Sequence, residues 1–235
     1  MEDTISKPLF VEFYGLPGCG KSTVSHMVSE RLSKEGYVVA EPSYEIDHLS
    51  SIIRKFKKLL LGINYSFFKQ KLYKEVSEIV SKNGYFGTNK FLQTLNIIQK
   101  ILEYNKKQSK DVIFWDQGLV QAALSLSTQG NIASSDNLNQ LYCLLDKSVR
   151  VLNVLIDVDE NIALKRMLIR PSNNSRVEKL KDKEDKYLML NRFQLGIDSI
   201  NKNYSKEVVN GVDDIDNQVT HIYKVISAYL RTHDS

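Results

Sequence analysis

The sequence predicts an α/β fold in which helices cover both faces of a five-stranded parallel sheet. Short apolar runs alternate along the chain with longer stretches of helical periodicity, which is the βαβ rhythm of a parallel sheet. The runs are rich in Val, Ile and Phe without clean alternation, as in strands buried on both faces. The expected strands are Leu9–Tyr14, Tyr37–Glu41, Val112–Trp115, Val149–Ile156 and Val208–Val209.

A glycine-rich motif joins the first strand to the first helix. It reads Gly15-Leu16-Pro17-Gly18-Cys19-Gly20-Lys21-Ser22, the full form of G-x-x-x-x-G-K-[ST], followed by Thr23. In such a loop the backbone N–H groups surround a polyphosphate, the lysine reaches the outer phosphates and the serine hydroxyl takes one Mg²⁺ position. The helix that follows adds its positive N-terminus. The motif therefore predicts binding of Mg²⁺ and ATP.

Glycine is expected to be required at Gly15 and Gly20, because a side chain there would block the approach of the phosphates. Cys19 reads as a small filler of the loop rather than a nucleophile. The helix that begins near Lys21 is expected to stop at Gly36.

Composition bounds the class of protein. The chain has 235 residues, 42% of them hydrophobic, and a net charge of +4, so we expect one domain over residues 1–235. Because Lys and Glu are interspersed, the charge weakly favours a phosphorylated ligand and does not indicate a nucleic-acid polymer or a membrane as partner. Two cysteines cannot form a disulfide framework, and no leader or long apolar span is present. We therefore expect a soluble, cytoplasmic protein, with a homodimer left open.

Polar residues follow each predicted strand, at the rim where parallel sheets bind their ligands. Asp116 follows the third strand; it either orders Mg²⁺ or caps the helix from Leu119. Glu41, Asp157 and Asn210 follow the other strands. Glu12 interrupts a strand that should be buried, so it is either paired internally or catalytic. Trp115 is either core or a wall of a pocket.

Two special regions interrupt the alternation of strands and helices. The segment of about 44–108 reads as helices over 46–61, 67–81 and 88–107. In kinases of small molecules, a segment at this place binds the acceptor of the phosphoryl group, so it is the expected acceptor-binding region. After the fourth strand, Asp159 can cap a helix that ends at Pro171.

That second region, about 166–178, contains three arginines in a polar context. Arg166, Arg170 and Arg176 are either surface charges paired with Glu or a lid that closes guanidinium groups over phosphates. Because a phosphate loop is present, we favour the lid.

These elements together resemble the thymidylate kinase and deoxynucleoside kinase branch of the P-loop kinases. The likeness runs from about residue 7 to 225 and implies a three-layer P-loop NTPase fold. It rests on the phosphate loop, Glu41-Pro42, Asp116 and the three arginines, the last leading into Val177-Glu178. By this resemblance Asn210-Gly211-Val212 lies near the adenine.

The departures from the two family patterns bear on the acceptor. Thymidylate kinases typically place arginines where this chain has Ala40 and Gln117. The guanidinium groups that would bind an acceptor monophosphate are therefore missing at these positions. Deoxynucleoside kinases phosphorylate a bare hydroxyl, with a general base at the position of Glu41. They also carry a Gln and a basic residue at the spacing of Gln93 and Lys100. Ordinary polar residues on the solvent-facing side of a helix would explain these two equally well.

The sequence thus predicts a kinase that transfers the γ-phosphoryl of ATP to a small acceptor, a nucleoside or nucleotide. Lys21, Mg²⁺ and the lid arginines would neutralise charge, Glu41 would act as base or as a capping or pairing residue, and Gln117, Gln93 and Lys100 would contact the acceptor. Two alternatives remain: a kinase of a non-nucleotide alcohol such as an amino sugar or antibiotic, and a non-catalytic regulator controlled by its nucleotide state.

The lid interpretation predicts protection of residues 166–178 when both substrates bind. The run Ser172–Ser175 has no apolar side chain to anchor it, and phosphates are the natural partners of the arginines that flank it. Hydrogen exchange with ATP and acceptor together should slow across this segment. Exchange unchanged by the ligands would identify the arginines as ordinary surface charges.

Overall fold

The computed structural model describes residues 8–41, 111–115, 118–127, 150–169, 180–201 and 206–232, together with Lys74, Ser77, Glu78, Asp136, Asn139, Gln140, Cys143 and Val177. The helices expected over 46–61, 67–81 and 88–107 lie outside these residues, except that Lys74, Ser77 and Glu78 are helical. In the described part of the chain, no helix combines the length and apolar character needed to cross a membrane.

Five parallel strands form one sheet, as the sequence predicts. They are β1 (Leu9–Tyr14), β2 (Val39–Ala40), β3 (Val112–Trp115), β4 (Arg150–Asp157) and β5 (Glu207–Asn210), in the order β2-β3-β1-β4-β5. Every neighbouring pair is parallel. The predicted bounds of β1 and β3 are confirmed, β2 is shorter than expected, and β4 and β5 differ by one residue at the ends. The phosphate-loop strand is thus the centre of the sheet.

Burial follows position in the sheet. All residues of the central strands β1 and β3 are buried, as their continuous apolar runs predict. The expectation that the last strand is buried on both faces is wrong, because β5 is an edge strand with a single neighbour. Its Val208 is 48% exposed, while Val209 on the other face is buried.

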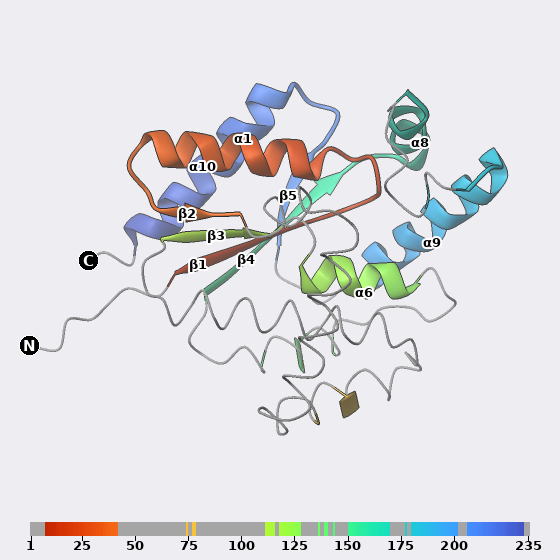
Figure 1. Ribbon diagram of the computed structural model, residues 1–235, viewed down its shortest axis with the longest axis horizontal. Helices are drawn as coiled ribbons and strands as arrows, with labels where there is room; N and C mark the ends of the chain where they lie inside the picture. The colour runs from red at the N-terminus through yellow and green to blue at the C-terminus, as the bar shows by residue number, and fades with distance from the viewer. Residues whose placement is uncertain are drawn as a thin grey trace, which may run out of the picture.

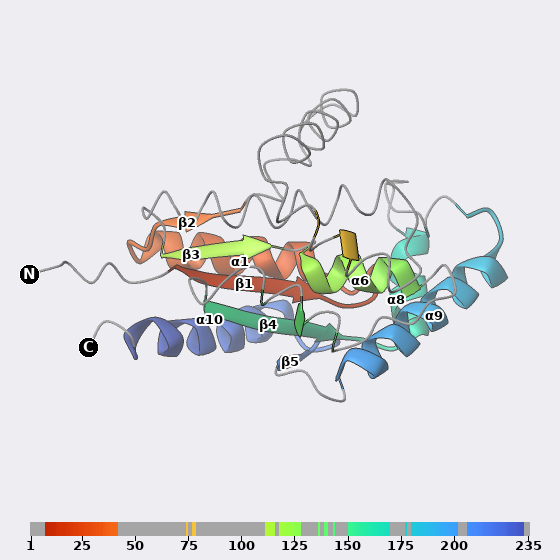
Figure 2. The same cartoon turned by 90° about the horizontal axis from the view of Figure 1, so that it is seen from below.

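Helices cover both faces of this sheet (Figures 1 and 2). Helices α1 (Lys21–Lys34) and α10 (Ile215–Arg231) pack together on one face, and α6 (Leu119–Ser127) and α9 (Lys183–Asn201) on the other. Helix α8 (Glu160–Ile169) follows β4 and packs against α9. The chain is therefore a three-layer α/β structure, as predicted.

Two helix boundaries follow their sequence signals. Helix α1 ends just before Gly36, whose φ of +95° lies in the left-handed region that favours glycine. The backbone N–H of Asn161 donates to Asp159 Oδ1 at 2.7 Å, so Asp159 caps α8 as predicted. Helix α8 ends at Ile169; Pro171 lies outside the described residues.

Aromatic side chains fill the centre of the core. Phe13 and Phe114 stack with ring centroids 5.7 Å apart, and Phe10 lies 6.2 Å from Trp115. Trp115 is only 3% exposed, so its burial supports the core alternative. This packing joins β1 to β3 directly behind the phosphate loop.

Candidate nucleotide-binding site

The loop between β1 and α1 has a backbone that only glycine adopts readily. Gly15, Gly18 and Gly20 have φ of +149°, +86° and +102°. A Cβ on Gly15 would lie 2.6 Å from the carbonyl oxygen of Ile156, and one on Gly18 would lie 2.8 Å from that of Ala163. The loop is thus pressed against the end of β4 and against α8.

The atoms of the protein itself give one of these glycines a further reason. At Gly15 a Cβ would meet the backbone of Ile156, whereas at Gly20 it would meet no protein atom within 4 Å. Glycine at position 20 is favoured by its positive φ. That side chains at Gly15 and Gly20 would block the phosphates stays a prediction.

The N-terminus of α1 has the character of an anion site. Gly20 precedes the helix without a side-chain cap, the first turn holds no acidic residue, and the helix opens with Lys21. A lysine beside the positive end of a helix is electrostatically unfavourable, and the N–H groups at a helix start can bind an anion. A bound polyphosphate would neutralise the Lys21 ammonium and accept hydrogen bonds from the N–H groups, so these residues fit the phosphates of ATP.

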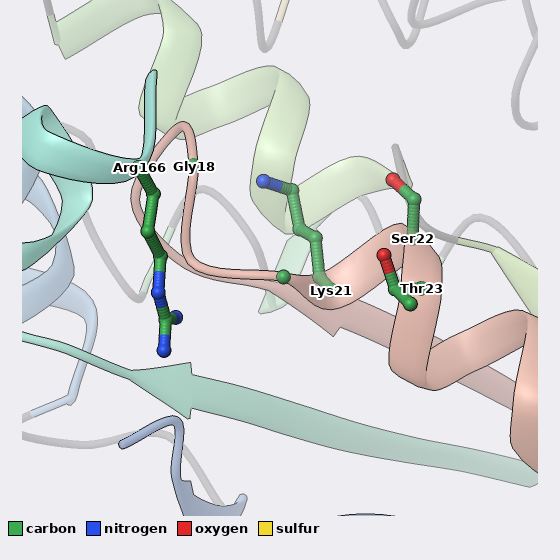
Figure 3. A pocket seen from close by; sticks show the side chains of 6 residues that line it. Gly18, Lys21, Ser22, Thr23 and Arg166 are labelled. Atoms are coloured by element: carbon green, nitrogen blue, oxygen red, sulfur yellow. The ribbon is translucent and has the colours of Figure 1, made fainter. Parts of the chain in front are cut away.

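A cavity of about 210 Å³ opens at this helix end. It is lined by Gly18, Gly20, Lys21, Ser22, Thr23 and Arg166. Figure 3 shows Arg166 coming from α8 and the other polar side chains from the first turn of α1. The volume is below the roughly 300 Å³ at which sites for whole drug-sized ligands begin. It suits the phosphate part of a nucleotide.

Lys21 and Cys19 make contacts within the loop itself. The Lys21 ammonium donates to the carbonyl oxygen of Leu16 at 3.3 Å and lies 4.0 Å from Cys19 Sγ. Cys19 is 1% exposed, which suits a small filler. Its backbone N–H donates to the carbonyl oxygen of Leu16 at 3.1 Å, which closes the turn.

Arg166 connects the phosphate loop to the turn after β5. Its Nη1 donates to the carbonyl oxygen of Cys19 at 3.0 Å, and its Nη2 to that of Gly211 at 2.8 Å. A planar guanidinium holds two acceptors at once. The other predicted lid arginines, Arg170 and Arg176, lie outside the described residues.

The turn Asn210-Gly211-Val212 therefore lies beside the phosphate loop. A Cβ on Gly211 would be 2.5 Å from Val158 Cγ1, so only glycine fits without displacement. Asn210 Oδ1 accepts from the backbone N–H of Val212 at 3.1 Å, which shapes the turn. Val212 itself is 55% exposed.

Glu41 follows β2 and makes a contact that sequence reasoning missed. Its Oε2 lies 3.1 Å from His26 Nδ1 on α1, and Glu30 lies 3.6 Å from the other ring nitrogen. Glu41 is not among the described residues that line the cavity. The pair depends on the packing of α1 against β2, which no local sequence signal gives.

Glu12 is paired internally, the first of the two alternatives. It is fully buried, and its Oε1 accepts from the backbone N–H of Gln121 at 3.1 Å. The side chain of Gln121 in turn accepts from the backbone N–H of Gly15 at 3.2 Å. Nothing in the local sequence singled out Gln121.

Several predicted site residues lie outside the described part of the chain. They are Asp116, Gln117, Gln93 and Lys100. Their roles toward Mg²⁺ and the acceptor stay predictions. Ser22, the other expected magnesium ligand, lines the cavity.

Two solved structures that resemble this chain are named as kinases. A deoxyadenosine kinase from M. mycoides with products dCMP and dCDP bound superposes with a TM-score of 0.51 and 14% identity, over 94% of this chain and 100% of that one. A shikimate kinase from Bacteroides thetaiotaomicron gives 0.51 and 12%, over 93% and 98%. No protein-family model and no curated protein matches the sequence. The chain therefore shares the fold of these two proteins, and identities this low establish the fold alone.

The contacts of Arg166 predict a measurable role in stability without any ligand. Two guanidinium bonds, each worth about 0.5 to 1.5 kcal/mol, sit at a partly solvated position, so Arg166→Met should lower the free energy of unfolding by about 1 to 2 kcal/mol. Its exposed neighbour Lys165 is the control, and Lys165→Met should change it by less than about 0.5 kcal/mol. Urea denaturation measures both. Equal effects would mean that the two bonds contribute nothing.

Proposed function

We propose that this protein is an ATP-dependent phosphotransferase that moves the γ-phosphoryl of ATP to a hydroxyl of a small acceptor, a nucleoside or nucleotide. The supporting observation is the cavity at the start of α1, lined by Lys21 and Ser22 of a complete phosphate-binding motif and by Arg166 of α8. Two solved structures that share the fold are named as kinases of small molecules, which is in keeping with the proposal.

Catalysis would come from positioning and charge neutralisation. The N–H groups at the start of α1 and the Lys21 ammonium would bind the β- and γ-phosphates. Arg166, with Arg170 and Arg176, would neutralise charge on the transferring group. When bound, Mg²⁺ would neutralise phosphate oxygens, held by the Ser22 hydroxyl and by Asp116; these are oxygen donors of the kind magnesium prefers.

The acceptor side favours attack by an unphosphorylated hydroxyl. Ala40, which is buried in β2, and Gln117 stand where thymidylate kinases, by the resemblance, carry arginines for the acceptor monophosphate, and neither is charged. Without such a group, an acceptor phosphate would repel the γ-phosphate at short range. Glu41 is the proposed base for the hydroxyl proton, and His26 would orient its carboxylate.

A second candidate is a kinase of a non-nucleotide alcohol. The methyl side chain at Ala40 is the observation that favours it, because an alcohol without a phosphate group needs no arginine at this position. The equal TM-scores of the deoxyadenosine and shikimate kinases leave the acceptor class to experiment.

Lys21→Ala should reduce phosphoryl transfer by about 10²-fold or more, because the ammonium faces phosphate rather than core. The control is Lys34→Ala, an exposed lysine in the last turn of the same helix, which should retain activity. ADP release is followed with pooled nucleosides, nucleoside monophosphates and aminoglycosides as acceptors. Transfer retained by Lys21→Ala would refute the assignment, and slow hydrolysis without any dependence on acceptor would favour a nucleotide-controlled regulator.

Glu41→Gln should lower kcat on the true acceptor by about 10²- to 10⁴-fold with ATP affinity nearly unchanged, because the amide cannot take a proton. Glu30→Gln is the matched control, since it alters the other carboxylate beside His26. Steady-state kinetics of both variants give kcat and the KM for ATP, and Glu30→Gln should keep the kcat of the wild type. Full activity of Glu41→Gln, or a monophosphate accepted far better than any unphosphorylated acceptor, would contradict the hydroxyl mechanism.

A further inference from the structure

Glu12 is a fully buried acidic residue in the central strand of the sheet. Its strand neighbours are Trp115 on β3 and Asn153 on β4, both buried. Burying a carboxyl group is costly unless hydrogen bonds and favourable dipoles compensate. The proposed mechanism gives Glu12 no chemical step, so its place in the core calls for a separate explanation.

The carboxylate lies at the start of α6. Gln121 is the third residue of that helix, and its backbone N–H donates to Glu12 Oε1 at 3.1 Å. Glu12 thus caps α6 from another element, where the helix dipole favours negative charge. A Cβ on Gly118 would lie only 2.3 Å from Glu12 Cδ, so glycine at this position makes room for the carboxylate.

The same helix residue reaches the phosphate loop. The carboxamide oxygen of Gln121 accepts from the backbone N–H of Gly15 at 3.2 Å, and both groups are buried. Gly15 opens the loop, in a conformation with φ of +149°. A continuous bridge therefore runs from Glu12 through Gln121 to Gly15.

Two described residues on either side of positions 116 and 117 also contact Glu12. Residues 116 and 117 join Trp115, which pairs with Glu12 in the sheet, to Gly118, which lies against the Glu12 carboxylate. Trp115 thus meets the backbone of Glu12, and Gly118 meets its side chain.

We propose that Glu12 is a positioning residue: acting through Gln121 it holds the Gly15 end of the phosphate loop, and its carboxylate against Gly118 sets the start of α6, the helix that carries Gln121. The catalytic consequence rests on the proposed function, whereas the hold on Gly15 does not. The competing explanation is that Glu12 only stabilises the fold. In that case its variants would lower stability without altering the nucleotide site.

The first test replaces the acceptor of the Gly15 hydrogen bond. Gln121→Met keeps the size of the side chain, and Mg-ADP should bind about 5- to 10-fold more weakly, as expected for one lost buried hydrogen bond. Val120→Ala is the control, since it removes buried packing from the same helix without touching the bridge. Calorimetric titration gives the Kd and thermal denaturation the stability. If the Kd of both variants follows their loss of stability, the positioning role is overturned.

The second test uses the close approach of Glu12 and Gly118. Gly118→Ala should displace the carboxylate and lower kcat, and a shorter acid should make room for the new methyl group. The double variant Glu12→Asp/Gly118→Ala is therefore expected to recover at least about 5-fold of the lost kcat. If the kcat losses of Glu12→Asp and Gly118→Ala simply add in the double variant, the close approach of these two residues has no effect and the inference is contradicted.

A readout without activity separates this inference from the proposed function. Wild-type protein that transfers phosphate to no acceptor would refute the kinase while leaving the bridge testable. In amide-resolved hydrogen exchange of the ligand-free protein, the Gly15 N–H should exchange at least about 10-fold faster in Gln121→Met and in Glu12→Ala than in Val120→Ala. Equal exchange in all three variants would overturn the inference whatever the activity.

Discussion

The packing of the phosphate loop against two backbone carbonyls is the constraint on which the site depends. Gly15 lies against the carbonyl oxygen of Ile156 and Gly18 against that of Ala163, at distances that leave no room for a side chain. Because Ile156 belongs to β4 and Ala163 to α8, the loop takes its position from the sheet and from the helix that carries Arg166. The loop can therefore present its cavity without a ligand to shape it.

Positive charge gathers in this fixed frame. Lys21 and the start of α1 lie on the cavity, and Arg166 lines it from α8. Carbonyl oxygens of the loop and of the neighbouring turn accept from both side chains, through Leu16, Cys19 and Gly211. These backbone acceptors hold the cations in place, and a polyphosphate is the ligand that would neutralise them. The electrostatics of the site thus favour the same ligand as the sequence motif.

Local signals predicted most of the fold. Continuous apolar runs marked β1 and β3, Gly36 marked the end of α1, and Asp159 marked the start of α8, because each signal is contained within a few neighbouring residues. The runs could not show which strand lies at an edge, so the exposure of Val208 was not foreseen.

The candidate site was predictable only in part. The motif identified the loop and the cavity, whereas the contacts of His26 with Glu41 and of Gln121 with Glu12 and Gly15 depend on how separate elements pack. Glu12 and Gln121 are 109 positions apart in the chain, and no local pattern signals such a contact.

The central claim, transfer of the ATP γ-phosphoryl to a small hydroxyl acceptor, is tested most directly by identifying the phosphorus product. Phosphorus NMR of the protein with Mg-ATP and the acceptor that stimulates ADP release would follow each species in one sample. The account predicts a phosphomonoester resonance that grows in step with ADP, with little inorganic phosphate. Inorganic phosphate as the sole product, or no consumption of ATP with any acceptor pool, would contradict it.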